Sequence, residues 1–333
     1  MAAGEQLMEA EAAQVPPCDA CGGGNWRLHF TGLTDRIHGA PGSFTLWRCV
    51  ECGTLRLWPV PADMSPFYPD TYIAFDRAGT RHGPARAVGL RFAWRQAFRK
   101  TIWVRRRSRW VLRRHNVASE LLEYASSPTL SLLDVGCGGG SFVAGARRLG
   151  VDGMGIEPSH AGCRVAAQRG VPVHHGTLED AEVAPASFDV VRFSHVLEHL
   201  PSPKTSLSLA FDALRPGGLV VVESPNGGGV MATLLGRDWY PLDAPRHLWL
   251  FNRESLHMLL QDAGFQVSCM TTRSWGGHLF KSLRYAMESI GSATIPADAS
   301  GGLPEGFSGV SAYLDACGQG DALLAWARKP ACA

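Results

Sequence analysis

The stretch that decides the fold is residues 132–142, with the sequence LLDVGCGGGSF. An apolar run ends at Val135, a glycine-dense turn follows, and a helix-forming segment begins near Ser141. Glycine suits such a turn because it tolerates positive φ and lets a ligand approach the backbone closely. Glu157 ends the next apolar run, at the distance where an acid meets a ribose diol in nucleotide-binding sheets. The stretch therefore predicts a strand, a turn and a helix that bind an adenosine-type ligand.

The spacing of the glycines separates two ligand classes. A dinucleotide fingerprint reads G-x-G-x-x-G and places a pyrophosphate at the helix N-terminus. Here Asp134 precedes the glycines, and its charge would repel a pyrophosphate while suiting a cationic amino acid group. The alternative is a tight strand-to-helix connection without a ligand, in which Glu157 is a surface acid.

Short apolar runs alternate with helix-period segments from Ser127 onward, which is the pattern of a parallel sheet with crossover helices. Two later runs, 266–271 and 322–327, are candidate edge strands. Residues 276–320 form an insertion before the last run, and we expect a helix followed by a loop or lid. The strand candidates in the body of the sheet are residues 130–135, 153–157, 171–174, 189–193 and 219–223.

Several motifs occur in the order seen in one large family. They are DVGCGGG at 134–140, GTLED at 176–180, SFDVV at 187–191, HVLEHLPSP at 195–203 and LRPGG at 214–218. Together they resemble the class I S-adenosylmethionine-dependent methyltransferases over residues 128–270. The resemblance implies an α/β, Rossmann-like, seven-stranded sheet with the last strand antiparallel, and methyl transfer from a sulfonium cofactor.

The same resemblance assigns cofactor contacts. It places Gly136 and Gly138 against the cofactor, Asp134 near its methionine end and Glu157 on its ribose hydroxyls. Thr177 and Leu178 would flank the adenine, although many relatives carry Asp where Thr177 stands. The candidate cofactor-binding residues are Asp134, Gly136, Cys137, Gly138, Glu157, Thr177, Leu178 and Ser194.

Three histidines are candidates for the base that a hydroxyl or carbon acceptor would need. We rank them His247, His195 and His199, because His247 lies in a segment that resembles the acceptor-facing part of related enzymes. Each has a structural alternative. His199 would brace a loop, His195 would line the cofactor pocket, and His247 would orient a turn.

Two other chemistries are disfavoured. Glu198 with His199 could hold a divalent cation, as similar quinone-precursor O-methyltransferases do, but adjacent helical residues diverge by about 100° and need ligands from elsewhere. A nucleobase acceptor is also disfavoured, because FSHV at 193–196 stands where amine-methylating relatives carry an Asp/Asn-Pro-Pro-aromatic element.

Two C-x-x-C pairs predict a structural zinc ribbon. Cys18, Cys21, Cys49 and Cys52 can supply four thiolates, and a glycine follows each pair. Aromatic runs at 26–30 and 44–48 are the expected ribbon strands. Four independent core cysteines are the alternative. A zinc ribbon before a methyltransferase domain also resembles sugar C-methyltransferases, which makes a glycosyl group a candidate acceptor.

The formal charge of +2 conceals an uneven distribution. Thirteen of the 32 basic residues lie between Arg77 and Arg114 with no acid among them, so the remainder carries −11. The pattern in residues 89–114 predicts an amphipathic helix. Its roles stay open among a solvated face, a contact for an anionic or lipid-linked acceptor, peripheral membrane contact and, least favoured, nucleic acid.

The composition completes the prediction. No apolar run reaches the ~18–20 residues of a membrane span, and the first 17 residues lack a signal-peptide core, so we expect a cytoplasmic protein.

We expect a methyltransferase acting on a hydroxyl or carbon of a small metabolite, with S-adenosylmethionine and structural zinc. The alternative is a zinc-ribbon nucleic-acid binder with a degenerate or RNA-directed methyltransferase domain. The expected division is a flexible 1–16, a ribbon at 17–60, a basic helical connector at 61–126 and a catalytic domain at 127–333.

Overall fold

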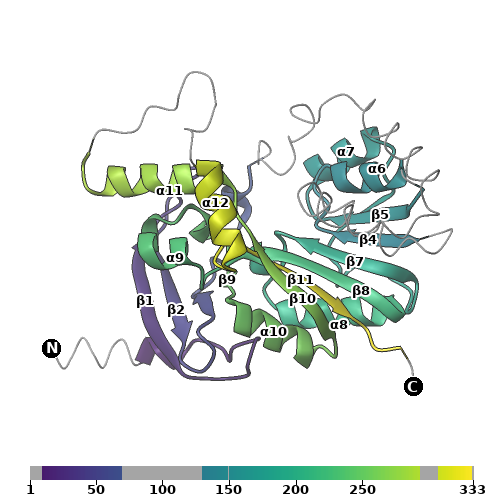
Figure 1. Ribbon diagram of the computed structural model, residues 1–333, viewed down its shortest axis with the longest axis horizontal. Coiled ribbons are helices and arrows are strands. Elements are labelled where there is room, and N and C mark those ends of the chain that lie inside the picture. Colours follow the sequence, from purple (N-terminus) through teal and green to yellow (C-terminus); the bar gives the residue numbers. More distant parts are fainter. Residues whose placement is uncertain (1–9, 70–129, 149, 293–306, 332–333) are drawn as a thin grey trace. The chain divides into compact units, whose positions relative to one another are not determined.

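The computed structural model describes residues 10–69, 130–148, 150–292 and 307–331 (Figure 1). The basic segment 77–114, most of the expected connector and the loop 293–306 lie outside the described residues. Among the described helices, none combines the length and the apolar character needed to cross a membrane.

The larger sheet confirms the α/β prediction. It has seven strands in the order β10-β11-β8-β7-β4-β5-β6, and its last strand, β11, runs antiparallel to β8. Short, mostly apolar runs form these strands, as expected for strands covered on both faces. Their bounds are β4 Ser131–Val135, β5 Asp152–Glu157, β6 Val173–His175, β7 Phe188–Ser194, β8 Leu214–Pro225, β10 Gln266–Arg273 and β11 Ala322–Arg328.

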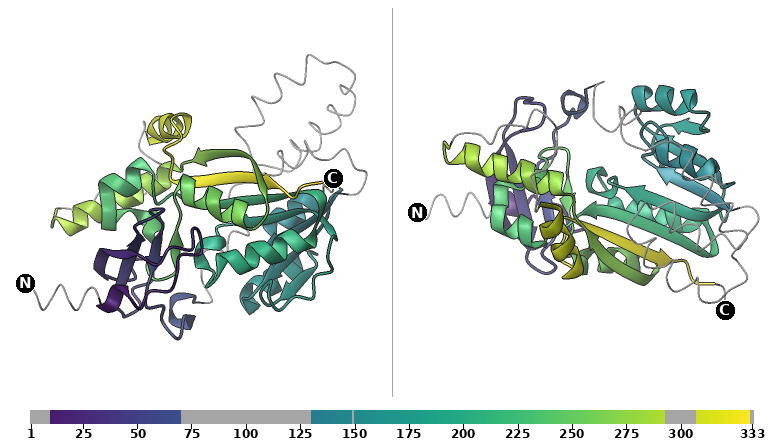
Figure 2. Two further views of the ribbon diagram at one scale, coloured as in Figure 1. Left: turned by 90° about the horizontal axis from the view of Figure 1, so that it is seen from below. Right: turned by 45° about the horizontal axis from the view of Figure 1, so that its top comes forward.

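One detail of the predicted sheet is wrong. We expected two late edge strands, but only β10 lies at an edge, whereas β11 lies between β10 and β8. Figure 2 shows β10 and β11 side by side. Most β11 side chains are buried, and this composition fits an interior strand.

Helices connect and cover the strands. Asn252 and Ser255 form a capping box at the start of α10, and the Ser159 hydroxyl accepts from the backbone N–H of Gly162 at the start of α7. The expected insertion contains two helices, α11 and α12, where we predicted one. The bounds are α6 Ser141–Arg147, α7 His160–Gln168, α8 Pro203–Ala213, α9 Val230–Leu235, α10 Arg253–Asp262, α11 Gly276–Ser289 and α12 Phe307–Ala316.

The chain divides into two compact units. One unit comprises residues 70–177, and in its described part Val143, Ala144, Ala166 and Val171 form a buried apolar cluster. The other unit joins residues 1–69 with residues 178–333. The N-terminal cysteine module, residues 10–69, is therefore packed with residues 178–333 in one unit.

The second sheet shows how this packing arises. Its order is β1-β2-β3-β9, where β1 (Trp26–Leu33) and β2 (Phe44–Cys49) are the two expected ribbon strands and β3 (Leu55–Leu57) extends them. The fourth strand, β9 (Trp249–Leu250), comes from the later part of the chain and pairs antiparallel with β3. Figure 1 shows β9 beside the purple ribbon strands. The ribbon sheet is complete only with this later segment.

Candidate functional site

The glycine turn after β4 has the backbone that the sequence predicted. Gly136, Gly138 and Gly140 have φ of 65°, 54° and 70°, in the left-handed region that favours glycine. A Cβ added to Gly155 on β5 would lie 2.3 Å from the sulfur of Cys137, so strand and turn pack too closely for a side chain there. This packing holds the backbone of the turn in place beside the strand ends.

Glu157 is tied to this turn. Its Oε2 accepts from the backbone N–H of Gly138 at 2.8 Å, and its Oε1 accepts from that of Ser159 at 2.9 Å. The side chain is buried, and burial raises its pKa despite these two hydrogen bonds. A carboxylate has about four acceptor sites, so two donors leave capacity for a diol. The surface-acid alternative for Glu157 is therefore wrong.

The remaining cofactor candidates divide between the two units. Asp134 is buried at the end of β4, and burial with the nearby charges of Asp134 and Glu157 raises the pKa of Cys137. Thr177 ends the unit that holds these residues. In the other unit Leu178 is buried, and the hydroxyl of Ser194 donates to Glu223 at 3.1 Å.

Glu198 lies at the centre of the three candidate histidines. Its side chain is fully buried, and its Oε1 lies 3.3 Å from Nδ1 of His195. The rings of His199 and His247 meet edge to face with centroids 4.7 Å apart. Among the described residues, neither carboxylate oxygen of Glu198 accepts a well-aligned hydrogen bond. The structure therefore gathers all three histidines around one buried acid.

The backbone fixes the tautomers of two of these histidines. Nδ1 of His247 lies 2.7 Å from the carbonyl of Pro241, and Nδ1 of His199 lies 2.9 Å from that of Arg246. A carbonyl only accepts, so both Nδ1 atoms carry a proton, and Nε2 is the nitrogen of each ring that holds the lone pair in the neutral form. Burial and the nearby His247 lower the pKa of His199 to about 4, so it is neutral near pH 7.

One ligand atom from each of Glu198, His199 and His247 lies within 4.8 Å of the others. His247 thus provides the partner that the adjacent pair lacked, and the three could hold a divalent cation.

His195 differs from the other two histidines. It follows β7 with φ of 56°, a rare conformation for a residue with a side chain, and its backbone N–H donates to the backbone carbonyl of Glu223 at 2.7 Å. Its side chain is 37% exposed, whereas that of His247 is 9% exposed. The Trp275 ring lies 5.5 Å from its own. An exposed imidazole backed by a buried carboxylate is suited to accept a proton.

Sequence reasoning missed Arg246. Its guanidinium is fully buried, donates from Nε to both oxygens of Asp243 at 3.0 and 3.1 Å, and pairs with Asp35 at 2.7 Å. These two acids outweigh burial and raise the pKa of Arg246 further above its ordinary value. The i, i+3 spacing of Asp243 and Arg246 was the only local signal.

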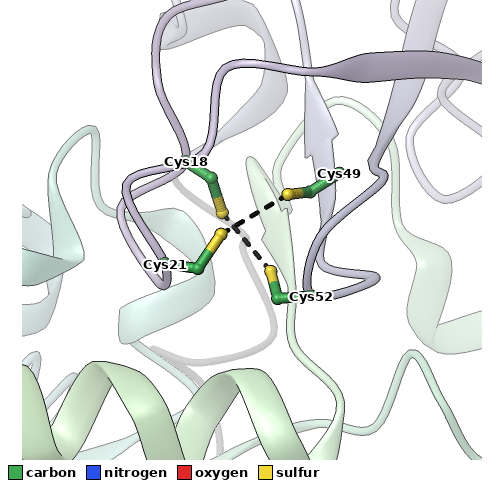
Figure 3. A group of neighbouring side chains, drawn as sticks. All are labelled: Cys18, Cys21, Cys49 and Cys52. Carbon is green, nitrogen blue, oxygen red and sulfur yellow. Dashed lines mark hydrogen bonds between the residues drawn. The ribbon is translucent and has the colours of Figure 1, made fainter.

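The four predicted cysteines converge (Figure 3). The sulfurs of Cys18 and Cys52 lie 3.6 Å apart, and those of Cys21 and Cys49 lie 3.5 Å apart. Tetrahedral zinc with Zn–S bonds of about 2.3 Å places sulfurs about 3.8 Å apart, so this set fits zinc with a small adjustment. The alternative of four independent core cysteines does not explain this convergence.

We expect one zinc per chain bound by these cysteines, and Cys49→Ser should lose it because a structural site needs all four thiolates. Elemental analysis of purified protein measures the zinc. Cys269→Ser, at an exposed cysteine outside the cluster, should keep the full content. Wild-type protein without zinc would contradict the prediction, and a second metal that survives Cys49→Ser would indicate occupation of Glu198, His199 and His247.

Known proteins match this chain in sequence and in structure. The sequence model of the methyltransferase domain family matches residues 103–269. A ubiquinone biosynthesis O-methyltransferase of Cereibacter sphaeroides is 31% identical over 164 residues, which cover 44% of this chain and 66% of that protein. A protein of Mycolicibacterium smegmatis named "Probable S-adenosylmethionine-dependent methyltransferase" is 34% identical over 160 residues, which cover 46% of this chain and 59% of that protein.

The chain thus spans less than two thirds of these curated relatives. Among solved structures, a SAM-dependent methyltransferase from Thermotoga maritima has 21% identity and a TM-score of 0.44, and the match covers 68% of this chain and 96% of that chain.

Proposed function

The chain belongs to the methyltransferase domain family, and on this premise we propose that it transfers the methyl group of S-adenosylmethionine to a small-molecule acceptor. The observation that carries the proposal is the glycine turn held by Glu157. A Cβ at Gly162 would lie 2.8 Å from Cγ of Glu157, so the start of α7 also leaves no room for a side chain beside this acid. A turn of this kind presents backbone and a carboxylate to a ribose.

The acceptor atom we propose is a hydroxyl. The relative in Cereibacter sphaeroides carries O-methyltransferase in its name, and a hydroxyl acceptor must lose a proton, for which His195 is the best-placed base. Transfer to carbon is the second candidate, with the same need for a base. A glycosyl or lipid-linked hydroxyl is the acceptor class suggested by the ribbon and the basic segment.

A small acceptor is consistent with the space near the histidine turn. A cavity of about 210 Å³ opens beside Asp243 in the unit that contains the ribbon, with Arg36, Asp238, Tyr240 and Tyr285 in its wall. Arg36 pairs with Asp238 and lies 3.8 Å above the Tyr285 ring. The wall also contains Arg237, whose guanidinium donates to the carbonyl of Thr31, so the cavity suits a polar molecule.

The proposed mechanism assigns each group a task. S-adenosylmethionine, when bound, supplies an electrophilic methyl on its sulfonium. Glu157 holds the ribose hydroxyls and Asp134 the cationic amino acid end, by the resemblance described above. Nε2 of His195 takes the proton from the acceptor hydroxyl, and Glu198 stabilises the imidazolium that forms. His199 is neutral near pH 7, and its ring packs edge to face against that of His247.

Cofactor binding tests the proposal. Glu157→Gln should weaken S-adenosylmethionine binding by about 10- to 100-fold, the effect of losing hydrogen bonds worth about 1.5–3 kcal/mol to a charged group. Isothermal titration calorimetry on the purified chain measures the affinity. Asp152→Asn, at the exposed start of the same strand, is the matched control and should bind normally. Wild-type protein that binds no cofactor would instead favour the degenerate nucleic-acid-binding alternative.

A further inference from the structure

A fully buried ion pair joins the ribbon to the histidine cluster. Asp35, two residues after β1, and Arg246, in the turn before β9, are both fully buried, with Oδ1 and Nη2 2.7 Å apart. Backbone N–H groups of Ile37, His38 and Ala40 also donate to Asp35, at 3.0, 3.1 and 3.3 Å. The acid is therefore fixed by its own loop before it meets the guanidinium.

Arg246 links Asp35 to the histidine cluster. Its carbonyl oxygen accepts from Nδ1 of His199, and its Nη1 donates to the carbonyl of Phe67 at 3.2 Å. The hydroxyl of Tyr68, the residue after Phe67, lies 3.0 Å from Nδ1 of His199. Three residues that precede the catalytic sequence thus converge on Arg246 and His199.

The Arg246 turn also fixes the neighbouring histidine and acid. Arg246 binds Asp243, and the backbone N–H of His247 donates to the Asp243 carbonyl at 3.1 Å. The backbone N–H of Leu248 donates to the carbonyl of Glu198 at 2.7 Å. A shift of the guanidinium would therefore move His247 and the Glu198 backbone together.

We propose that Asp35 is a positioning residue for methyl transfer. The ribbon then helps to place the side chains of the catalytic site. Through Arg246 it sets the places of His199 and His247, and through the backbone hydrogen bond from Leu248 it sets the place of Glu198 behind His195. The proposal rests on the proposed function, in which His195 is the base. It assigns the N-terminal module a task that zinc binding alone does not require.

The chemistry of the pair supports a positioning role over simple packing. Desolvating two charges offsets most of their attraction, so an apolar pair of similar volume often gives equal or greater stability. A guanidinium that donates hydrogen bonds to two acids can, however, adopt few orientations. A second acid that links the ribbon to the later part of the chain, Asp19, is partly exposed, and within the described residues it accepts from the Ser202 hydroxyl and the backbone N–H of Lys204.

The test compares two ribbon acids. Asp35→Asn keeps an oxygen for the loop N–H groups and removes the charge, and we expect kcat to fall by about 10²-fold, as for a misplacement of roughly 1 Å. KM for S-adenosylmethionine and zinc content should stay within twofold of wild type. Asp19→Asn is the matched control and should keep wild-type kcat. Long-range ¹H–¹⁵N spectra of the full chain should show the Nδ1-protonated signal of His199 changed in Asp35→Asn and unchanged in Asp19→Asn.

A second variant tests the proposal if Asp35→Asn does not fold. Tyr68→Phe removes one contact to His199 without touching a buried charge, and we expect the same spectral change with a fall in kcat of about three- to tenfold, in line with one hydrogen bond. Folded, zinc-loaded Asp35→Asn with unchanged kcat and unchanged His199 signal would overturn the proposal. A changed signal in a chain whose wild type transfers no methyl would refute the proposed function and leave the ribbon-to-histidine link standing.

Discussion

Replacing His195 by alanine should lower kcat by about 10²–10⁴-fold, the usual contribution of a positioned general base. The imidazole is 37% exposed, so an acceptor can reach it, and Nδ1 faces the buried Glu198. The measurement is release of S-adenosylhomocysteine with a panel of hydroxyl-bearing acceptors. S-adenosylmethionine affinity should change little, because the glycine turn and Glu157 are untouched. His257→Ala, at a histidine on α10 outside the cluster, is the control and should turn over normally.

The pH profile provides a sharper signature of the same role. Burial lowers the pKa of His195, but contact with Glu198 and the charges of Glu198 and Glu223 outweigh it and the repulsion of Arg192, so the pKa is raised. A base works when neutral, so kcat should fall as pH drops through this raised pKa. Glu198→Gln removes the largest stabilising charge and should move that limb to lower pH. A limb that stays in place, or full turnover by His195→Ala, would refute the assignment.

The parts of the fold that depend on neighbours in sequence were predictable. The turn at 136–140 is specified by its own glycines and the strand before it, and the two cysteine knuckles are each specified within four residues. The strands of the larger sheet follow from short apolar runs, because burial on both faces requires such runs. These signals were enough to predict the fold, the glycine turn and the cysteine cluster.

The parts that depend on distant partners were not predictable. β9 has two residues, too few for any periodic pattern, and its partner β3 lies almost 200 residues earlier. Asp35 and Arg246 are 211 positions apart, and each alone resembles an ordinary surface charge. The burial of Glu198 was not predictable either, since an acid beside a histidine is usually solvated. The ranking of His247 above His195 lacked this information, and the greater exposure of His195 now favours the reverse order.

Arg246→Met should lower the free energy of unfolding by about 3–5 kcal/mol, the cost of leaving a buried charge without its partner. The substitution keeps much of the side-chain volume but leaves Asp35 fully buried and Asp243 nearly so, both without the guanidinium. Urea unfolding followed by tryptophan fluorescence measures the loss. Lys204→Met is the control, because Lys204 and Asp262 are each about half exposed and such pairs contribute about 0–1 kcal/mol.

The pH dependence of this loss identifies its cause. In wild type, burial raises the pKa of Asp35, but the contact with Arg246 and the loop N–H groups outweigh it and lower the pKa, so the pair stabilises the fold above the unfolded pKa of aspartate. Without Arg246, burial dominates and the folded pKa rises above the unfolded one. The penalty is then full near pH 7 and shrinks as pH falls through that raised pKa, because the carboxyl takes up a proton. A loss that stays constant from pH 7 down to pH 4 would show that Arg246 acts through packing volume and that its charge does not anchor the ribbon to the histidine turn.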